Sequence, residues 1–172
     1  MKSLLPKLFH KDSSKGFTLI ELLVALTILV ILAVSVYVAL NPAQRLKDAK
    51  DARRSSDVDS ILTAIHQYIV DNKGSMPPNM PTVLQGEQQI GSSPTNATVC
   101  PAVVGTSCTG MATGCANLGA DLPKYLASMP IDPAAGSIDL TNTGYSVKRD
   151  ANGIVTVKAC HTDGTTPIQA SR

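Results

Sequence analysis

One uninterrupted apolar run, from Phe17 to Leu40, constrains this 172-residue chain more than any other feature of its sequence. As an α-helix rising about 1.5 Å per residue, this run of 24 residues spans roughly 36 Å, more than the roughly 30 Å hydrocarbon core of a bilayer. A secretory signal peptide has a shorter apolar region followed by a small-residue cleavage site, and neither is found here. We therefore predict a transmembrane helix over residues 17–40.

Both flanks of the apolar run are basic, so the charge pattern does not set its orientation. The first 16 residues hold four lysines and one aspartate, and the other flank holds Arg45, Lys47, Lys50, Arg53 and Arg54. The positive-inside rule counts basic residues on both sides and therefore does not decide between the two directions. The net charge of the whole chain is only +2, which gives no reason to expect a nucleic acid as partner.

All four cysteines follow the apolar run. They are Cys100, Cys108, Cys115 and Cys160. Zinc sites usually contain closely spaced cysteine pairs, and no Cys-x-x-Cys pair is present. An even number of cysteines favours two disulfides in an exported domain over free buried thiols, with three pairings open. Oxidised cysteines place the C-terminal part of the chain outside the cytoplasm.

Beyond the apolar run, a helical pattern resumes and a long irregular segment follows. Asn41-Pro42 should bend or break the helix, because proline lacks the backbone donor and disfavours helix before it. Apolar residues then recur every three or four positions, which predicts an amphipathic helix over residues 43–72. The stripe consists of Val58, Ile61, Leu62, Ile65, Tyr68 and Ile69. Residues 74–136 hold eight of the 11 prolines and eight of the 12 glycines, which indicates a long loop.

The C-terminal third predicts a small sheet. Residues 144–148 and 154–160 alternate β-branched and polar residues, and Asn152-Gly153 between them is a strong hairpin signal. Within the long loop, we expect a short helix over Asp121–Ser128 capped by Asp121. With 3% aromatic residues, the soluble core must be small and mainly aliphatic. The predicted fold class is α+β, with a long N-terminal helix, a long loop and a C-terminal antiparallel sheet.

A single acidic residue, Glu21, lies five residues into the apolar run. Placing a charged group inside a bilayer costs on the order of 2.5–3.5 kcal/mol on insertion scales, so the carboxylate needs a compensating interaction. One interpretation is a carboxyl near the helix end that is protonated or reaches the headgroups. The other is a functional group with a specific cationic partner.

The residues around Glu21 resemble a known signal. The sequence Lys15-Gly-Phe-Thr-Leu-Ile-Glu-Leu-Leu-Val24 is similar to the class III signal of type IV pilins and pseudopilins. In that signal, a short basic leader ends in glycine before a phenylalanine, and a glutamate follows four residues later. The predicted helix, loop and sheet extend the resemblance in outline over the whole chain.

The resemblance implies cleavage between Gly16 and Phe17 by a membrane prepilin peptidase, commonly with N-methylation of the new amine on Phe17. That amine supplies the cation that Glu21 lacks, and the pairing joins neighbouring subunits during assembly. The implied partners are identical or related subunits, the peptidase, an assembly platform with its ATPase, and lipid before assembly. The implied location is a single-pass precursor in the cytoplasmic membrane and then an extracellular filament.

These implications divide the chain into four parts. They are a cleaved leader (1–16), a transmembrane and polymerisation helix (17–40), an amphipathic helical half (41–73), and a head of loop and sheet (74–172). The family's usual proline near the middle of the helix is absent, with Val38 nearby, and Pro42 lies a turn later. The acidic, glycine-rich C-terminal signature of many major pseudopilins is also missing, which favours a pilin.

The resulting prediction is a structural filament subunit, with two alternatives. The near one is a pseudopilin of a type II secretion or competence system, and the distant one is a monomeric membrane-anchored binding or redox domain. A mature N-terminus at Phe17 and an extracellular polymer would separate a filament subunit from an anchored monomer.

The sequence predicts no enzyme, cofactor or strong metal site. His10, His66 and His161 are scattered, and no nucleophile elbow, phosphate loop or dinucleotide motif is present. By resemblance to the calcium-binding sheet loops of major pseudopilins, weak calcium candidates are Asp132, Asp139 and Asp150, although no calcium-loop spacing is found.

Three further segments have structural interpretations. Pro130-Ile131-Asp132-Pro133, followed by Tyr145, resembles the Asp-Pro turn before the sheet of many pilins and predicts an Asx turn. Residues 47–54 mix lysine and arginine with aspartate and lack aromatics, so we predict a solvated helix face or a subunit contact rather than a nucleic-acid site. Asn96-Ala97-Thr98 fits a glycosylation acceptor.

Overall fold

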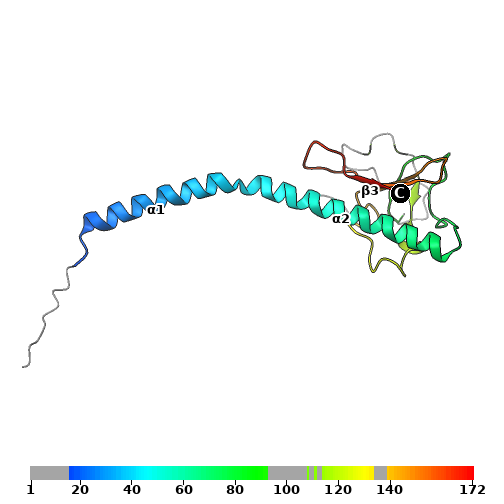
Figure 1. The fold of residues 1–172 in the computed structure, drawn as a ribbon, viewed down its shortest axis with the longest axis horizontal. Coiled ribbons are helices and arrows are strands. Elements are labelled where there is room, and N and C mark those ends of the chain that lie inside the picture. The colour runs from blue at the N-terminus through cyan, green and yellow to red at the C-terminus, as the bar shows by residue number, and fades with distance from the viewer. Residues whose placement is uncertain (1–15, 93–107, 109–110, 112–113, 134–138) are drawn as a thin grey trace, which may run out of the picture. The chain divides into compact units, whose positions relative to one another are not determined.

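The computed structural model describes residues 16–92, 108, 111, 114–133 and 139–172, in two compact units, Met1–Pro42 and Ala43–Arg172. Figure 1 shows a long apolar helix in the first unit, and a second helix with a small sheet in the second. The helices followed by a mostly antiparallel sheet confirm the α+β prediction. Cys100 and the glycosylation candidate at Asn96–Thr98 lie outside the described residues.

The first unit consists of α1, Leu19–Leu40. The helix begins two residues after Phe17 because Thr18 has extended backbone angles and acts as its N-cap. It ends at Asn41, which adopts the left-handed conformation with φ of 39°. The predicted break before Pro42 is thus confirmed.

The second helix is α2, Pro42–Asp71, which lies in the second unit from Ala43 onward and is within one residue of the predicted span. Pro42 occupies its first position, where the missing N–H costs no hydrogen bond. Lys73 and Gly74 end the helix with φ of 56° and 89°, and the Gly74 N–H donates to the Ile69 carbonyl at 2.8 Å. Glycine suits this left-handed position because it has no Cβ.

The sheet has five strands in the order β2-β1-β3-β4-β5. The predicted hairpin is confirmed as β3, Tyr145–Arg149, paired antiparallel with β4, Val155–Ala159, with Val147 opposite Val157. Three short strands were not predicted: β1 (Gln88–Ile90), β2 (Cys115–Ala116) and β5 (Gln169–Ser171). The β1–β2 pair is parallel, so the sheet is not purely antiparallel.

The short helix of the loop lies elsewhere than predicted. It is α3, Leu118–Asp121, so Asp121 is its last residue rather than the cap of a helix running to Ser128. The Asp121 carboxylate instead accepts two hydrogen bonds from Asn79, one from the backbone N–H and one from the side-chain amide, each 2.9 Å long. Asp121 therefore ties the segment after α2 to α3.

The core of the second unit lies between α2 and one face of the sheet. The apolar stripe of α2 packs in the same cluster as the inward side chains of β3 and β4. Tyr145 is the one fully buried aromatic among the described residues, and aliphatic side chains surround it, as the composition predicts. The buried α2 residues are Val58, Ile61, Leu62, Ala64 and Ile65, and those of β3 and β4 are Tyr145, Val147, Val155, Val157 and Ala159.

A disulfide joins Cys108 of the long loop to the end of β4. Cys108 is bonded to Cys160, which directly follows β4, and their Cα atoms are 4.9 Å apart. Cys115, at the start of the edge strand β2, is also disulfide-bonded. The prediction that the cysteines form disulfides is confirmed for Cys108 and Cys160.

Candidate functional site

Thr18 and Glu21 form a closed pair of hydrogen bonds at the start of α1. The Glu21 N–H donates to the Thr18 hydroxyl at 3.2 Å, and the Thr18 N–H donates to Glu21 Oε2 at 2.9 Å. The Thr18 hydroxyl also donates to Glu21 Oε2 at 2.8 Å. This reciprocal arrangement is a capping box, which satisfies backbone donors that the first helical turn leaves free. The sequence signal of a capping box is Thr-x-x-Glu, so the capping role of Thr18 could have been predicted from the sequence.

The Glu21 carboxylate is left with unused acceptor capacity. Both bonds from Thr18 fall on Oε2, and Oε1 accepts no hydrogen bond from the described residues. A carboxylate offers about four lone-pair positions. Glu21 is therefore held in place with one oxygen open to a further donor.

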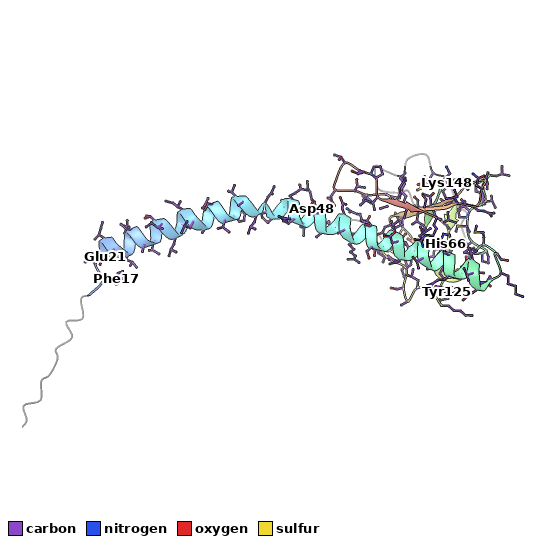
Figure 2. All side chains as sticks on the ribbon, viewed as in Figure 1. Phe17, Glu21, Asp48, His66, Tyr125 and Lys148 are labelled. Atoms are coloured by element: carbon purple, nitrogen blue, oxygen red, sulfur yellow. A yellow bond between two sulfur atoms is a disulfide. The ribbon has the colours of Figure 1, made fainter. Side chains whose placement is uncertain are left out.

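The bond between Gly16 and Phe17 is open to solvent. Phe17 is 80% exposed, and a Cβ added to Gly16 would meet no atom within 4 Å. Figure 2 shows Phe17 and Glu21 together at the start of α1. The described residues thus leave space around this peptide bond for an enzyme to reach it.

Helix α1 has the length and composition of a membrane span. None of its 22 residues is buried within the described part of the chain, and Glu21 is its one charged residue. The hydroxyls of Thr27 and Ser35 donate to the carbonyls of Val24 and Leu32, each at 2.8 Å, so their hydrogens need no water. At about 1.5 Å per residue, the helix spans roughly 33 Å, enough to cross a bilayer.

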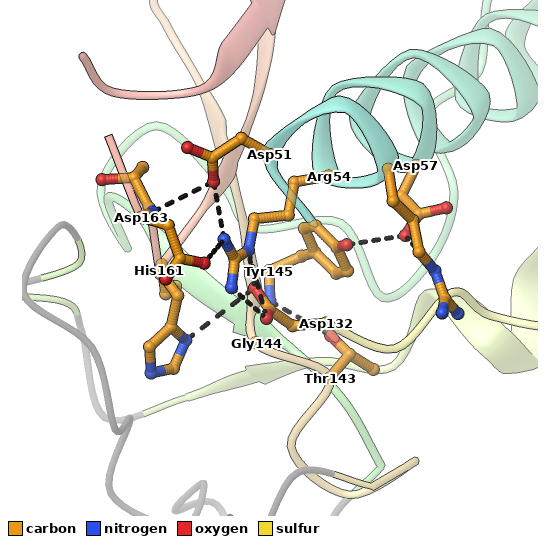
Figure 3. Close-up of polar contacts among 12 residues, drawn as sticks. Asp51, Arg54, Asp57, Asp132, Thr143, Gly144, Tyr145, His161 and Asp163 are labelled. Atoms are coloured by element: carbon orange, nitrogen blue, oxygen red, sulfur yellow. Dashed lines mark hydrogen bonds and ion pairs between the residues drawn. The ribbon is translucent and has the colours of Figure 1, made fainter. Parts of the chain in front are cut away.

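A second polar cluster lies where α2 meets the sheet, centred on Arg54. The Arg54 side chain is 2% exposed and bonds three carboxylates, those of Asp51, Asp132 and Asp163 (Figure 3). Its Nε lies 3.0 Å from Asp132 Oδ2, and its Nη1 lies 2.6 Å from Asp51 Oδ1 and 2.7 Å from Asp163 Oδ2. We call these four residues the Arg54 cluster.

The Arg54 cluster joins three segments that are distant in the sequence. Asp132 precedes β3, Asp163 follows β4, and Asp51 lies one turn before Arg54 on α2. Asp51 also accepts hydrogen bonds from the backbone N–H groups of Asp163 at 3.0 Å and Gly164 at 2.8 Å. The helix is thereby fastened to the loops on either side of the β3–β4 hairpin.

The carboxylates keep Arg54 charged although it is buried. Burial alone lowers the pKa of Arg54, but the bonds to Asp132, Asp163 and Asp51 outweigh it and raise the pKa. One turn further along α2, Asp57 accepts a 2.8 Å hydrogen bond from the buried Tyr145 hydroxyl. Burial and then this bond raise the pKa of Tyr145, so the phenol stays neutral and remains a donor.

The Arg54 cluster corrects the interpretation of residues 47–54. Arg54 is not part of a solvated face, although Lys47 and Arg53 are exposed as predicted. The missed signal is its phase, because Arg54 precedes Val58, Ile61 and Ile65 at helical spacing and so shares their buried face. A charged residue in phase with a buried stripe requires partners, and Asp132 and Asp163 provide them.

The three calcium candidates are not brought together. Asp132 binds Arg54, and the Asp139 carboxylate accepts from the N–H groups of Thr141 and Asn142. Asp150 accepts from the N–H groups of Asn152 and Ile154 in the hairpin turn. Among the described residues, no group of three His, Cys, Asp or Glu side chains is arranged to hold a metal ion. The Asx turn predicted at Asp132 involves residue 134, outside the described residues.

The comparisons with known proteins bear on the N-terminal site alone. Residues 11–37 match the family model of the prokaryotic N-terminal methylation motif. No curated protein and no solved structure matches the chain. The matched segment contains Gly16, Phe17, Thr18 and Glu21, and ends within α1.

Replacing Arg54 tests whether the cluster holds the second unit together. Arg54→Met removes the cation and leaves three carboxylates facing one another, so we expect a loss of about 3–5 kcal/mol in the free energy of unfolding. Urea unfolding of the full chain in detergent micelles, followed by tyrosine fluorescence, measures it. The matched control is Arg53→Met, whose side chain is 62% exposed and should change stability by less than about 0.5 kcal/mol. Equal stability of the two variants would contradict the assignment.

The Asp51 carboxylate should make the stability of this unit depend on pH. Burial raises its pKa, but the N–H of Asp163, then Arg54 and the N–H of Gly164, outweigh burial and lower it. Because the pKa of Asp51 is lower in the folded than in the unfolded chain, its carboxylate stabilises the fold at pH values above the unfolded pKa of about 3.9. This stabilisation is lost as the pH falls from there through the folded-state pKa. Between pH 6 and pH 3, the urea concentration at the unfolding midpoint should therefore decrease more for the wild type than for Asp51→Asn. Parallel curves would show that Asp51 does not contribute.

Proposed function

We propose that this chain, a type IV pilin-like precursor by its N-terminal methylation motif and its helix-and-sheet fold, is a filament subunit activated by cleavage between Gly16 and Phe17. The observation that carries the proposal is the position of Glu21, a fixed carboxylate with one open oxygen in an otherwise uncharged membrane helix. Cleavage creates a positively charged amine on Phe17, four residues before Glu21.

The new amine is suited to the unused capacity of Glu21. An ammonium carries three donors, and a hydrogen bond between charged groups is stronger than one between neutral groups. The Thr18 bonds already fix the rotamer of Glu21, so little side-chain entropy remains to be lost when an amine binds. We infer that Oε1 receives the amine of a neighbouring subunit during assembly.

The exposed surface of α1 supports assembly through this helix. Large apolar side chains along its whole length are uncovered, from Leu19 at 81% exposed to Leu40 at 58%. Lipid covers such a surface in the membrane, but outside the membrane other apolar helices must do so. Extraction into a filament core replaces lipid by α1 helices of identical or related subunits.

The division of the chain follows from this proposal. Residues 1–16 form the leader, 17–40 the membrane and polymerisation helix, 41–73 the amphipathic helix and 74–172 the rest of the head. The prepilin peptidase and an assembly platform with its ATPase are the proposed machinery. The precursor then resides in the inner membrane with a single span, and the filament is extracellular.

A bulky residue at position 16 should block processing. In Gly16→Leu the new side chain occupies the space beside the scissile bond, so we expect the uncut precursor to accumulate. Immunoblots and N-terminal sequencing of cells that contain the peptidase measure the cut fraction. Ser13→Leu, a similar change three residues earlier, should be cut normally. A mature band starting at Phe17 in Gly16→Leu would count against the cleavage assignment.

Loss of the Glu21 carboxylate should impair assembly without preventing insertion. Glu21→Ala removes the acceptor for the amine and makes the helix more apolar, so the chain should insert and be cut. We expect at least about tenfold less filament in the sheared fraction. Without the Glu21 carboxylate, the Phe17 ammonium of the neighbouring subunit would enter the filament core with no carboxylate to pair with. The control is Thr27→Ala, which removes a hydroxyl from the same helix. Normal filament yield from Glu21→Ala would refute the role, and a chain that retains Met1 would favour an anchored monomer.

A further inference from the structure

The face of the sheet that does not cover the core is polar. Strands β3 and β4 place Tyr145, Val147, Val155 and Val157 in the core, and their alternate residues point to the opposite side. Figure 2 shows Lys148 on the side of the sheet away from α2. A cavity of about 270 Å³ lies on this side. Its lining consists of Glu87, Ser146, Lys148, Thr156, Lys158, Gln169 and Ser171, which we call the outer-face pocket.

The polar groups of the outer-face pocket are partly arranged by one another. The Ser146 hydroxyl donates to Glu87 Oε1 at 2.6 Å, and Lys158 Nζ lies 3.7 Å from the same oxygen. The hydroxyls of Thr156 and Ser171 share a 2.9 Å hydrogen bond. Ser146, Thr156, Lys158 and Ser171 stand on paired strands, and Glu87 directly precedes β1, so the sheet sets the spacing of these side chains.

The pocket carries an excess of positive charge. It contains two lysines and one glutamate, and Glu87 is already engaged by Lys158 and Ser146. The Lys148 ammonium has no ion pair or hydrogen bond with any described residue. A concave polar surface with an uncompensated ammonium attracts an anionic group.

A second observation shows unmet polar groups on the same face. Gln89 is paired with Ser146 in the register of β1 and β3, so both side chains leave the sheet on one side. Gln89 is 1% exposed, and neither its amide nitrogen nor its amide oxygen has a hydrogen-bond partner among the described residues. A buried amide without partners is costly, but Gln89 does not line the outer-face pocket, so it marks the same face of the sheet without contributing a group to the pocket.

We propose that the outer-face pocket binds an acidic sugar unit, with its carboxylate or phosphate on Lys148 and its hydroxyls on Glu87 and Gln169. The charge excess selects the anion, and the mixture of donors and acceptors suits a polyol. The volume lies just below the roughly 300–1,000 Å³ of common ligand pockets, which suits a ligand of monosaccharide size. The proposal concerns the surface of the second unit and does not depend on filament assembly.

Calorimetric titration of the full chain in detergent micelles tests the proposal. The probes are glucuronate, glucose 6-phosphate, glucose and inorganic phosphate. We expect at least one acidic sugar to bind about tenfold more tightly than glucose or inorganic phosphate, because only the acidic sugar uses both the ammonium and the hydroxyls. The better of the two acidic sugars identifies a carboxylate or a phosphate as the preferred anion.

Two lysine variants decide whether the binding belongs to this pocket. Lys148→Gln keeps a polar side chain of similar length but removes the charge, and should weaken acidic-sugar binding about tenfold. Lys124→Gln, at an exposed loop position outside the pocket, should leave it unchanged. Both variants should melt at the wild-type temperature. Absence of binding, equal binding of glucose, equal binding of inorganic phosphate, or an unchanged affinity of Lys148→Gln would each overturn the proposal.

Discussion

The uncovered apolar surface of α1 is the constraint on which the rest of the molecule depends. A helix of 22 residues with no buried side chain among those described needs lipid or other apolar helices around it in every state of the protein. The second unit, by contrast, has its own core between α2 and the sheet and requires no such cover. The chain therefore combines a unit that buries its own apolar core with a helix whose apolar surface must be covered by other molecules. This combination suits the proposed filament subunit, which would move from membrane to polymer.

Arg54 and Glu21 differ in how many partners their own chain provides. Arg54 is surrounded by three carboxylates of its own chain, and the second unit thereby gains a fixed connection between α2 and two loops. Among the described residues, the Glu21 carboxylate accepts hydrogen bonds from Thr18 alone, and both fall on one oxygen. A group that served folding alone would be expected to find its partners within the chain, as Arg54 does. The open oxygen of Glu21 is thus the feature that suggests a partner outside the chain, as proposed above.

The parts of the fold that were predictable are those set by local pattern. The length of the apolar run, the stripe on α2, Pro42 and the Asn152-Gly153 turn each specify their element through neighbouring residues. Strands β1, β2 and β5 have two or three residues each, too few for an alternating pattern; β1 pairs with β3, β5 pairs with β4, and β2 pairs with β1. Helix α3 precedes its predicted position because Asp121 bonds to Asn79, 42 residues away, instead of capping a helix. Contacts between residues so far apart cannot be predicted from the pattern of neighbouring residues.

The candidate sites follow the same division. Gly16, Phe17 and Glu21 lie within six consecutive residues, so their pattern could be recognised in the sequence, and Thr18 completes it by a four-residue signal. Asp132 and Asp163 are brought to Arg54 only by the folded hairpin, over separations of 78 and 109 residues. The outer-face pocket likewise exists only because Glu87 and Lys158 meet across β3. The residues on which the proposed processing and assembly depend therefore lie together at the start of the chain, whereas the surface of the second unit, with the outer-face pocket, is a product of the tertiary fold.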